Sequence, residues 1–235
     1  MYVAIEGVIG VGKTTLARLL RPMLDTEILL EIFEENPFLS DFYGDRARYA
    51  FQTQIFFLLS RYHQQRRTVP DLLAAGRSLI SDYTFSKDAL FARINLKGDE
   101  LEMYNKVHEA LGEKIPKPDL IVYLRADTDV LMQRIALRDR PYERNMEQGY
   151  IDLLNHAYED FFTKPYNGSP VLTIDTNPLN IVENLGHLKL IENRIREKLK
   201  LSPFQPSLPF GGAPAAAKPP PERTNAIDGP TPNPE

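Results

Sequence analysis

The residues best suited to chemistry form a glycine-rich run directly after the first apolar segment of the chain. The eight residues from Gly7 read Gly-Val-Ile-Gly-Val-Gly-Lys-Thr, which fits the pattern G-x-x-x-x-G-K-[ST] in full. Gly10 and Gly12 let the backbone curl so that successive N–H groups point at phosphate oxygens. Lys13 can neutralise the β- and γ-phosphates, and the Thr14 hydroxyl can hold Mg²⁺. The run therefore predicts a site for ATP or another nucleoside triphosphate, with Mg²⁺ as the metal cofactor.

A second candidate group is the carboxylate of Glu31, at the end of the next apolar run. From the tip of a strand that faces the phosphate loop, it could accept the proton of a hydroxyl that attacks the γ-phosphate, which is the position of a general base. Glu34 and Glu35 lie nearby. On position alone, a solvated acidic loop accounts equally well for all three carboxylates.

Two polar residues interrupt the apolar stripe of a long helical pattern that runs from Arg46 to Gln65. Gln54 and Arg61 are seven residues apart, and seven steps of about 100° return to nearly the same face of a helix. An amide and a guanidinium on one face can hydrogen-bond the polar edge of a nucleobase. A helix edge at which both side chains simply reach solvent is the competing interpretation.

A cluster of basic residues follows later in the chain. It consists of four arginines, Arg134, Arg138, Arg140 and Arg144. Like charges four residues apart on a helix repel each other by about 0.2–0.5 kcal/mol. A transferring phosphoryl group would relieve this repulsion, and an arginine-rich lid that closes over phosphates is common in such chemistry. A solvated helix end, with Asp139 and Glu143 as the compensating charges, is the alternative.

These groups need a scaffold that brings them together, and the apolar pattern predicts one. Five short aliphatic or β-branched runs are typical of strands: Tyr2 to Glu6, Glu27 to Glu31, Ser78 to Asp82, Asp119 to Leu124 and Pro170 to Ile174. They mostly lack polar alternation, as strands covered on both faces do, and helical patterns separate them. We therefore expect an α/β fold with a five-stranded parallel sheet flanked by helices. Ligands in such folds gather at the carboxyl ends of the strands, where nearly all the candidate residues lie.

Composition narrows the class of protein further. The 235 residues are 43% apolar and 26% charged, as in ordinary globular domains, and no apolar run approaches the roughly 20 residues of a membrane-spanning helix. Without cysteine, disulfide scaffolds, thiolate metal sites and cysteine nucleophiles are excluded. The net charge of −4 argues against a protein that coats nucleic acid. Since the N-terminus lacks the layout of a secretion signal, we expect a cytoplasmic protein without membrane or direct nucleic-acid contacts.

The composition changes abruptly at Ser202, and ten of the nineteen prolines fall in the last 34 residues. We therefore expect one folded domain over residues 1–201 and a disordered, proline-rich tail over residues 202–235. Within the tail, Gln205 to Phe210 resembles the Gln-x-x-Leu-x-Phe peptides with which bacterial replication proteins dock on the sliding clamp. A plain linker that happens to carry leucine and phenylalanine is the alternative.

In combination, these features resemble the deoxyribonucleoside kinase family, and specifically its bacterial deoxyadenosine and deoxyguanosine kinase-like members. The resemblance covers nearly all of residues 1–201. It rests on an ordered set of pieces: Glu6 to Leu16 with the phosphate loop, Glu31, Glu35 to Leu39, Phe42 and Tyr43, Gln54, Arg61, and Arg138-Asp139-Arg140 with Glu143. The phosphate loop alone is generic, whereas the ordered set is specific to the family.

The resemblance implies a role for each piece. Glu31 would deprotonate the 5′-hydroxyl of a deoxyribonucleoside, while Tyr43 and Glu143 would hold the 3′-hydroxyl of its sugar. Tyr43 would also crowd the 2′ position and so favour deoxyribose. Gln54 would pair with the base, and Arg61 would assist at its edge.

The resemblance also implies how the phosphates are bound. Thr15 would join the phosphate loop in binding ATP, and Arg134, Arg138 and Arg140 would form a lid over the phosphates. Within this lid, Arg134 would contact ATP, whereas Arg138 and Arg140 would act with Lys13 in the transfer itself.

One departure from the family pattern lies after the third predicted strand, where the family usually has an acidic residue, an arginine and a serine. Here the strand ends in Ser-Asp-Tyr-Thr. Asp82 matches the acidic position and could hold Mg²⁺ through water, but Tyr83 replaces the arginine. This leaves open which cation stabilises the acceptor oxygen, and a lid arginine is the expected substitute. Asp88 would face the base beside Arg61, and an ordinary solvated helix residue is the alternative for it.

Together these features favour an enzyme, homodimeric as the family implies, that phosphorylates the 5′-hydroxyl of a deoxyribonucleoside with ATP and Mg²⁺ in nucleotide salvage. Deoxyadenosine and deoxyguanosine are the favoured acceptors, with deoxycytidine as a further one. A nucleoside monophosphate kinase of the thymidylate kinase type shares the loop and a lid, but its anionic acceptor needs no base such as Glu31. A non-catalytic nucleotide-binding module is another alternative, for which Tyr83 in place of arginine is the best support.

Overall fold

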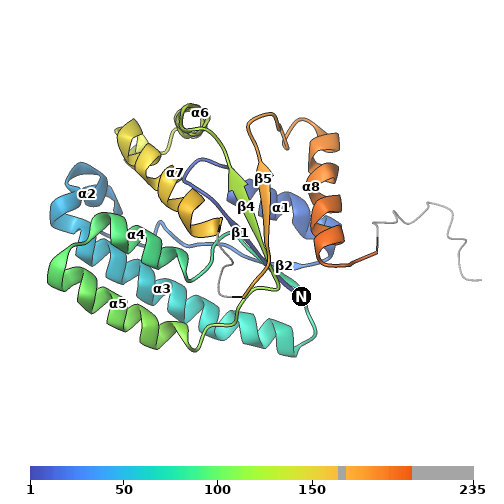
Figure 1. Ribbon diagram of the computed structural model, residues 1–235, viewed down its shortest axis with the longest axis horizontal. Coiled ribbons are helices and arrows are strands. Elements are labelled where there is room, and N and C mark those ends of the chain that lie inside the picture. The colour runs from blue at the N-terminus through green and yellow to red at the C-terminus, as the bar shows by residue number, and fades with distance from the viewer. Residues whose placement is uncertain (164–167, 203–235) are drawn as a thin grey trace, which may run out of the picture. The chain divides into compact units, whose positions relative to one another are not determined.

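A sheet of five parallel strands forms the centre of the fold in the computed structural model, which describes residues 1–163 and 168–202 (Figure 1). The strands are β1 (Tyr2–Glu6), β2 (Glu27–Leu29), β3 (Leu79–Ser81), β4 (Leu120–Arg125) and β5 (Val171–Asp175). Their order across the sheet is β2-β3-β1-β4-β5, and every neighbouring pair is parallel. The predicted α/β fold with a five-stranded parallel sheet is therefore confirmed, and β1 lies in its middle.

Helices pack on both faces of this sheet. They are α1 (Lys13–Leu24), α2 (Leu39–Gly44), α3 (Arg46–Ala74), α4 (Lys87–Asn95), α5 (Gly98–Gly112), α6 (Thr128–Arg138), α7 (Gln148–Phe162), α8 (Leu185–Lys198) and the short 3₁₀ helix η1 (Pro141–Glu143). α1 and α8 lie against one face, whereas α3 and α7, with α4 packed between them, lie on the other (Figure 1). Because the side chains of a strand alternate between faces, successive residues of β1 contact the two helix layers in turn. All five residues of β1 are buried for this reason.

The second strand is shorter than the sequence predicts. The pattern predicts a strand from Glu27 to Glu31, whereas β2 ends at Leu29. Two residues later, the backbone N–H of Glu31 donates to a carboxylate oxygen of Asp82 at 2.8 Å, so the chain leaves the ladder of the sheet. Glu31 is therefore in the loop beyond β2 and not at the last position of a strand.

The long helix extends further than predicted. The pattern predicts a helix from Arg46 to Gln65, and α3 continues to Ala74 through an internal Pro70. Val69 is fully buried against residues of β1, β2 and β3, with Leu72 partly buried beside it. Hydrophobic packing therefore maintains the helix across a residue that cannot donate the usual backbone hydrogen bond.

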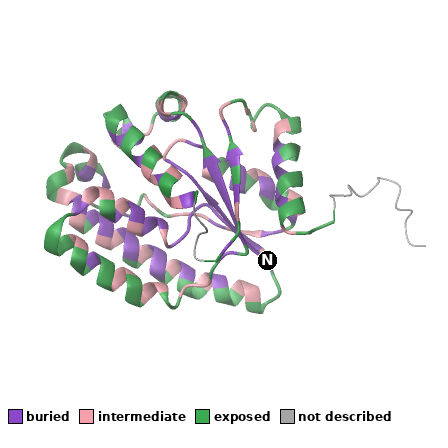
Figure 2. Cartoon of the chain, viewed as in Figure 1, coloured by how far each residue is buried: buried purple, intermediate pink, exposed green. Residues whose placement is uncertain are grey.

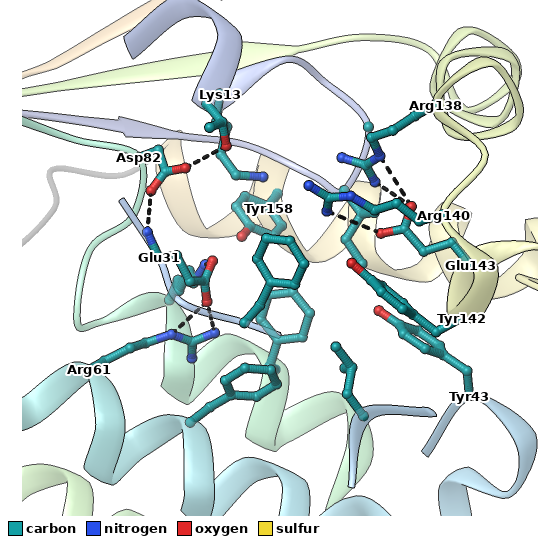
Figure 3. A pocket seen from close by; sticks show the side chains of 18 residues that line it. Lys13, Glu31, Tyr43, Arg61, Asp82, Arg138, Arg140, Tyr142, Glu143 and Tyr158 are labelled. Atoms are coloured by element: carbon teal, nitrogen blue, oxygen red, sulfur yellow. Dashed lines mark hydrogen bonds and ion pairs between the residues drawn. The ribbon is translucent and has the colours of Figure 1, made fainter. Parts of the chain in front are cut away.

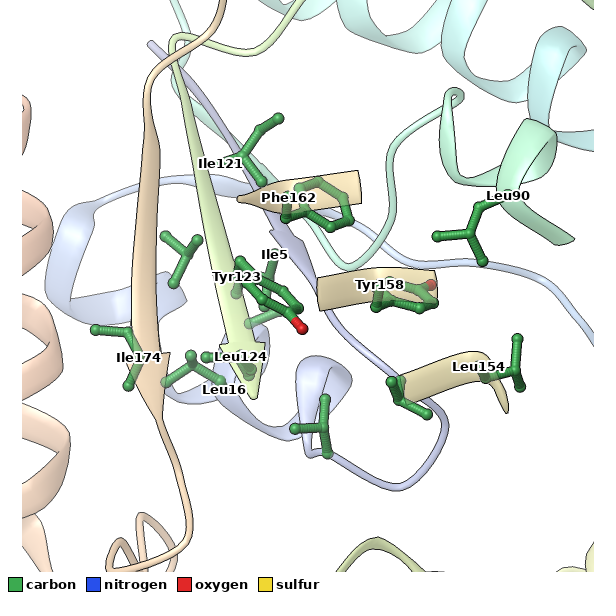
Figure 4. Close-up of a cluster of buried hydrophobic side chains, with 14 of the residues drawn as sticks. Ile5, Leu16, Leu90, Ile121, Tyr123, Leu124, Leu154, Tyr158, Phe162 and Ile174 are labelled. Carbon is green, nitrogen blue, oxygen red and sulfur yellow. The ribbon is translucent and has the colours of Figure 1, made fainter. Parts of the chain in front are cut away.

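The main core lies between the sheet and the helices (Figure 2). On the α7 side, the rings of Tyr158 and Phe162 stack on that of Tyr123 in β4, with centroid distances of 6.4 and 5.1 Å (Figure 4). On the opposite side, Leu16 of α1 and Ile191 of α8 belong to the same buried cluster. This packing fixes the strands whose carboxyl ends carry the candidate residues.

The fold does not test the predictions about the C-terminal tail and the boundary of the domain. The predicted tail, with the clamp-like segment Gln205 to Phe210, lies outside the described residues from position 203 onward. Its disorder, its docking and the domain boundary at residue 201 therefore stay predictions. No helix of the described segments is both long enough and apolar enough to cross a bilayer.

Candidate active site

The phosphate loop connects β1 to α1, as its motif requires. Gly7 and Gly10 have φ values of +146° and +87°, and Gly12, at +103°, is the N-cap residue of α1. A Cβ atom on Gly7 would lie 2.4 Å from the carbonyl oxygen of Leu124, and one on Gly10 would lie 2.8 Å from a side-chain carbon of Ile135. Gly7 and Gly10 are therefore required both for backbone conformation and for space. Close packing against β4 and α6 fixes the shape of the loop.

Lys13, the first residue of α1, folds back over the loop. Its Nζ atom donates to the carbonyl oxygens of Gly7 at 2.7 Å and Val8 at 3.1 Å. Burial and the nearby charge of Lys87 lower the pKa of Lys13 to about 8, although the carboxylates of the site oppose them. A phosphate group bound in the loop would add negative charge beside this amine and favour its charged form.

The side chain of Glu31 projects into a pocket in front of the phosphate loop (Figure 3). One carboxylate oxygen accepts from Arg61, whose Nε lies 2.8 Å away, and the other accepts from Nζ of Lys87 at 2.5 Å. Burial disfavours ionisation, but the charges of Arg61 and Lys87 outweigh it and hold the pKa of Glu31 well below its ordinary value. Glu31 is therefore ionised and fixed by two cations. The interpretation as a solvated acidic loop therefore holds for Glu34 and Glu35, which are exposed, but not for Glu31.

Asp82 lies beside Glu31 and the phosphate loop, directly after β3. Its carboxylate accepts from the hydroxyl of Thr14 at 2.5 Å and from the backbone N–H of Glu31 at 2.8 Å. A hydroxyl and a carboxylate next to a phosphate site are oxygen ligands of the kind that Mg²⁺ prefers. Within residues 1–163 and 168–202, no group of three or more acidic, histidine or cysteine side chains could hold a metal. The arrangement fits a Mg²⁺ ion that takes most of its ligands from phosphates and water.

Besides Glu31, Arg61 binds a carboxylate of α4. Its guanidinium forms an ion pair with Asp88, which is completely buried in the first turn of α4. The centre of the Phe57 ring lies 4.5 Å from the guanidinium carbon, and the ring helps to enclose the guanidinium. Neither Asp88 nor Arg61 is therefore a solvated helix residue. Arg61 links Glu31 to Asp88 in one buried network.

The opposite wall of the pocket carries another carboxylate, Glu143 (Figure 3). Arg138 donates to it from two nitrogens at 3.2 and 2.6 Å, and a terminal nitrogen of Arg140 lies 3.6 Å away. The ring of Tyr43 stacks on that of Tyr142 on the same wall, at a centroid distance of 6.3 Å. Burial raises the pKa of Tyr43 well above its ordinary value, so its hydroxyl stays protonated. This wall can therefore offer a ligand both a hydroxyl donor and a carboxylate acceptor.

The four arginines do not act as one cluster. Arg138 and Arg140 meet at the pocket, whereas Arg144 pairs with the exposed Asp139 at 2.7 Å. Arg134 donates to the hydroxyl and the carbonyl oxygen of Thr176 at 2.9 and 2.8 Å, beyond the end of β5. The compensating charges expected from Asp139 and Glu143 are thus present. The role of these arginines as a lid stays a prediction.

Two further predicted residues lie away from this pocket. Gln54 is buried on α3, with 2% of its surface exposed, and is not among the residues that line the pocket. Its proposed contact with a nucleobase therefore stays a prediction. Thr15 is exposed in the first turn of α1 and lines a second cavity, on the other side of the phosphate loop.

This second cavity was not expected from the sequence. Besides Thr15 and Arg134, its lining includes apolar side chains of the segment after β5, namely Leu179, Ile181 and Val182. No motif marks this segment, and only its position after a strand could have drawn attention to it. Gly10 and Arg138 line both cavities. The two cavities therefore meet at the phosphate loop, as a transfer between two ligands would require.

Glu6 is a buried carboxylate outside the predicted site residues. It ends β1 directly before the phosphate loop and accepts from the backbone N–H and the hydroxyl of Thr84 at 2.5 and 2.8 Å. Burial raises the pKa of Glu6 above its ordinary value, against the charges of Lys87 and Lys13. Glu6 therefore links the loop after β3 to the central strand. Its position at the end of a predicted strand is the feature of the sequence that could have identified it.

Replacing Glu6 with glutamine should change how stability depends on pH. Because its pKa is raised in the folded state, the folded protein keeps this proton over a pH range in which the unfolded chain has released it. The contribution of Glu6 to stability is therefore present below the unfolded pKa and is lost as pH rises through the folded pKa. Urea denaturation from about pH 5 to about pH 8 should show wild type losing stability relative to Glu6→Gln. A difference that does not vary with pH would contradict this.

Comparisons with known proteins show which proteins the chain is similar to. Residues 3–200 match the sequence profile of the family described as Deoxynucleoside kinase. The chain is 36% identical over 199 residues to a deoxyguanosine kinase of Bacillus subtilis (strain 168), which covers 83% of this chain and 96% of that protein. It is 32% identical over 192 residues to a deoxyadenosine kinase of Dictyostelium discoideum, covering 80% of this chain and 77% of that protein.

A solved structure is also similar. A deoxyadenosine kinase from M. mycoides, with the products dCMP and a flexible dCDP bound, superimposes with a TM-score of 0.74. The two sequences are 27% identical, and the match covers 84% of this chain and 100% of that chain. The likeness therefore extends over most of the fold.

Proposed function

Because the chain belongs to the deoxynucleoside kinase family, we propose that it transfers the γ-phosphoryl group of ATP to the 5′-hydroxyl of a deoxyribonucleoside. The observation that carries this proposal is Glu31, an ionised carboxylate in a pocket that faces the phosphate loop. The product would be a deoxynucleoside monophosphate, as in nucleotide salvage. The relatives are named for deoxyguanosine and deoxyadenosine, so we propose purine deoxyribonucleosides as preferred acceptors and deoxycytidine as a further one.

In the proposed reaction Glu31 accepts a hydrogen bond from the 5′-hydroxyl and takes its proton as the new O–P bond forms. The bond from the γ-phosphorus to the oxygen that bridges it to the β-phosphorus breaks in the same step, and ADP leaves. Lys13 and the backbone N–H groups of the loop hold the β- and γ-phosphates. Arg138 and Arg140 lie across the pocket from Glu31, where their charges can stabilise the group in transfer. Thr14 and Asp82 would hold Mg²⁺, which when bound would neutralise charge on the phosphates.

The sugar and the base would lie between Glu31 and the opposite wall. A sugar 3′-hydroxyl can accept from the Tyr43 hydroxyl and donate to the Glu143 carboxylate. Gln54 and Arg61 are the proposed contacts at the base. Since an amide presents both a donor and an acceptor, Gln54 can serve several nucleobases by rotating.

The two alternative functions have less support. A monophosphate kinase needs a free cation for the phosphate of its acceptor, but the two cations beside Glu31, Arg61 and Lys87, are both paired with its carboxylate. Membership of the family also favours a nucleoside acceptor. The best support for a non-catalytic module is that Tyr83 replaces the arginine of the family pattern. Lys87 weakens this support, because it supplies a positive charge in the same pocket.

We also propose that the protein forms a homodimer. Met103 on α5 and Leu59 on α3 are 57% and 42% exposed, on two helices that pack against each other. The proposal rests on the family resemblance, and these two side chains mark α3 and α5 as the helices that a second copy would cover. The cytoplasmic location and the docking of the tail on a sliding clamp stay predictions.

A kinase assay with ATP and Mg²⁺ tests the proposed function. The four natural deoxyribonucleosides would be compared with their 5′-monophosphates as acceptors. We expect deoxyadenosine and deoxyguanosine to react with kcat/KM at least about tenfold above any monophosphate, which corresponds to about 1.4 kcal/mol. Turnover of monophosphates alone would indicate a monophosphate kinase. Tight ATP binding without any turnover would indicate a binding module.

A further inference from the structure

Lys87 is a buried cation in the pocket to which neither the motifs nor the family resemblance assigns a role. It is the first residue of α4, only 4% exposed, and its Nζ atom donates to Glu31 at 2.5 Å. Arg61 holds the other oxygen of the same carboxylate from α3. Glu31 is therefore held by two cations that reach it from two different helices.

The position at which the family pattern has an arginine cannot supply this charge. Tyr83 is completely buried and packs with Leu29 and Val69, and its hydroxyl donates to the side chain of Gln64. Nζ of Lys87 lies 5.6 Å from the centre of the Tyr83 ring. The positive charge is therefore supplied by Lys87 of α4, four residues after Tyr83 in the chain. Tyr83 itself packs against α3.

The other cations of the pocket have different partners. Arg138 and Arg140 pair with Glu143 on the opposite wall, and Lys13 donates to carbonyl oxygens of the phosphate loop. The lid arginine expected to replace the missing family arginine is therefore not at Glu31 in this structure. Lys87 is there, and its charge also acts on Lys13, so the two amines are near each other.

The residues around Glu31 form a closed group of balanced charge. Lys87 pairs with Glu31, the adjacent Asp88 pairs with Arg61, and Arg61 pairs with Glu31. None of these four side chains is more than 14% exposed. Loss of Lys87 would leave this buried group with a net negative charge and one carboxylate oxygen of Glu31 without its donor.

We propose that Lys87 is the positioning residue for Glu31, which it holds toward the acceptor hydroxyl in place of the arginine that Tyr83 replaces. This inference rests on the proposed function of the pocket. Without Lys87, Arg61 still binds one oxygen of Glu31, but the carboxylate can rotate about that contact. Misplacing a reacting group slows the transfer more than it weakens binding of the nucleoside.

Steady-state kinetics of Lys87 variants test the proposal. Lys87→Met should lower kcat about 100-fold while KM for the deoxyribonucleoside changes less than about threefold. Lys87→Arg, which keeps the charge, should return kcat to within about tenfold of wild type. Lys189→Met is the matched control, because Lys189 is exposed on α8, and it should leave both constants unchanged.

A double-mutant cycle with Glu31→Gln separates positioning from other roles. If Lys87 acts through Glu31, adding Lys87→Met to Glu31→Gln should lower the single-turnover rate no further. Losses that multiply, or a folded Lys87→Met protein with wild-type kcat, would overturn the inference. Thermal denaturation checks folding, and Lys87→Gln replaces the methionine variant in the same cycle if that variant does not fold. A wild-type protein inactive on every deoxyribonucleoside would instead refute the proposed function.

Discussion

Replacing Glu31 with glutamine should lower kcat by about 10²- to 10⁴-fold, the contribution expected of a positioned general base. Glutamine has nearly the same shape, but it cannot take up the proton of a 5′-hydroxyl. Its NH₂ group would also face Arg61 or Lys87, both of which are donors. KM for ATP should change little, because the residues of the phosphate loop are unchanged. Steady-state kinetics with deoxyadenosine and deoxyguanosine would measure the change.

The low pKa of Glu31 fits this role. A carboxylate that stays ionised far below neutral pH is a weak base, but phosphoryl transfer does not need a strong base. In a loose transition state the attacking hydroxyl loses its proton late, so orienting that hydroxyl is the larger task. Because two cations stabilise the ionised form, Glu31 should produce no acid limb in the wild-type kcat profile above about pH 5.

Glu31→Asp is the matched control, since it keeps the charge and shortens the side chain. We expect it to lose less activity than Glu31→Gln. Folding must be measured for both variants, because breaking a buried ion pair costs about 3–5 kcal/mol. Arg61 keeps Asp88 as a partner, whereas Lys87 loses its carboxylate. A folded Glu31→Gln protein with wild-type kcat would refute the assigned base.

Much of the fold could be predicted because it depends on local sequence. Strands without polar alternation, separated by helical patterns, predict a parallel sheet covered on both faces, and the structure has all five. The phosphate loop is equally local, since one run of eight residues supplies its glycines, its lysine and its threonine. Errors arose where a tertiary contact decides the end of an element, as when Asp82 takes the backbone N–H of Glu31.

Contacts across the pocket could not be predicted in the same way. Glu31 and Lys87 are 56 residues apart in sequence and come together because β2 and β3 are neighbours in the sheet. In the sequence, Lys87 looks like any exposed lysine at the start of a helix. By contrast, Arg138 and Glu143 are five residues apart, and their pairing could be expected from the charge pattern alone.

Replacing Asp82 with asparagine should lower kcat by about 100-fold and raise the Mg²⁺ concentration needed for half-maximal activity. Asparagine keeps the oxygen that accepts from the backbone N–H of Glu31. The Thr14 hydroxyl, which donates to Asp82, can rotate and accept from the new NH₂ group. The local structure should therefore survive, and only the negative charge beside the phosphates is lost.

Titrating Mg²⁺ at saturating ATP and deoxyribonucleoside measures this effect. Asp175→Asn is the matched control, because Asp175 is an exposed carboxylate beyond the pocket that also accepts a backbone N–H, from Asn177 at 2.9 Å. It should leave both kcat and the Mg²⁺ requirement unchanged. Asp82 also holds the backbone of Glu31, so the titration separates its two roles. A lower kcat with an unaltered Mg²⁺ requirement would contradict the metal role and leave Asp82 as a support for Glu31.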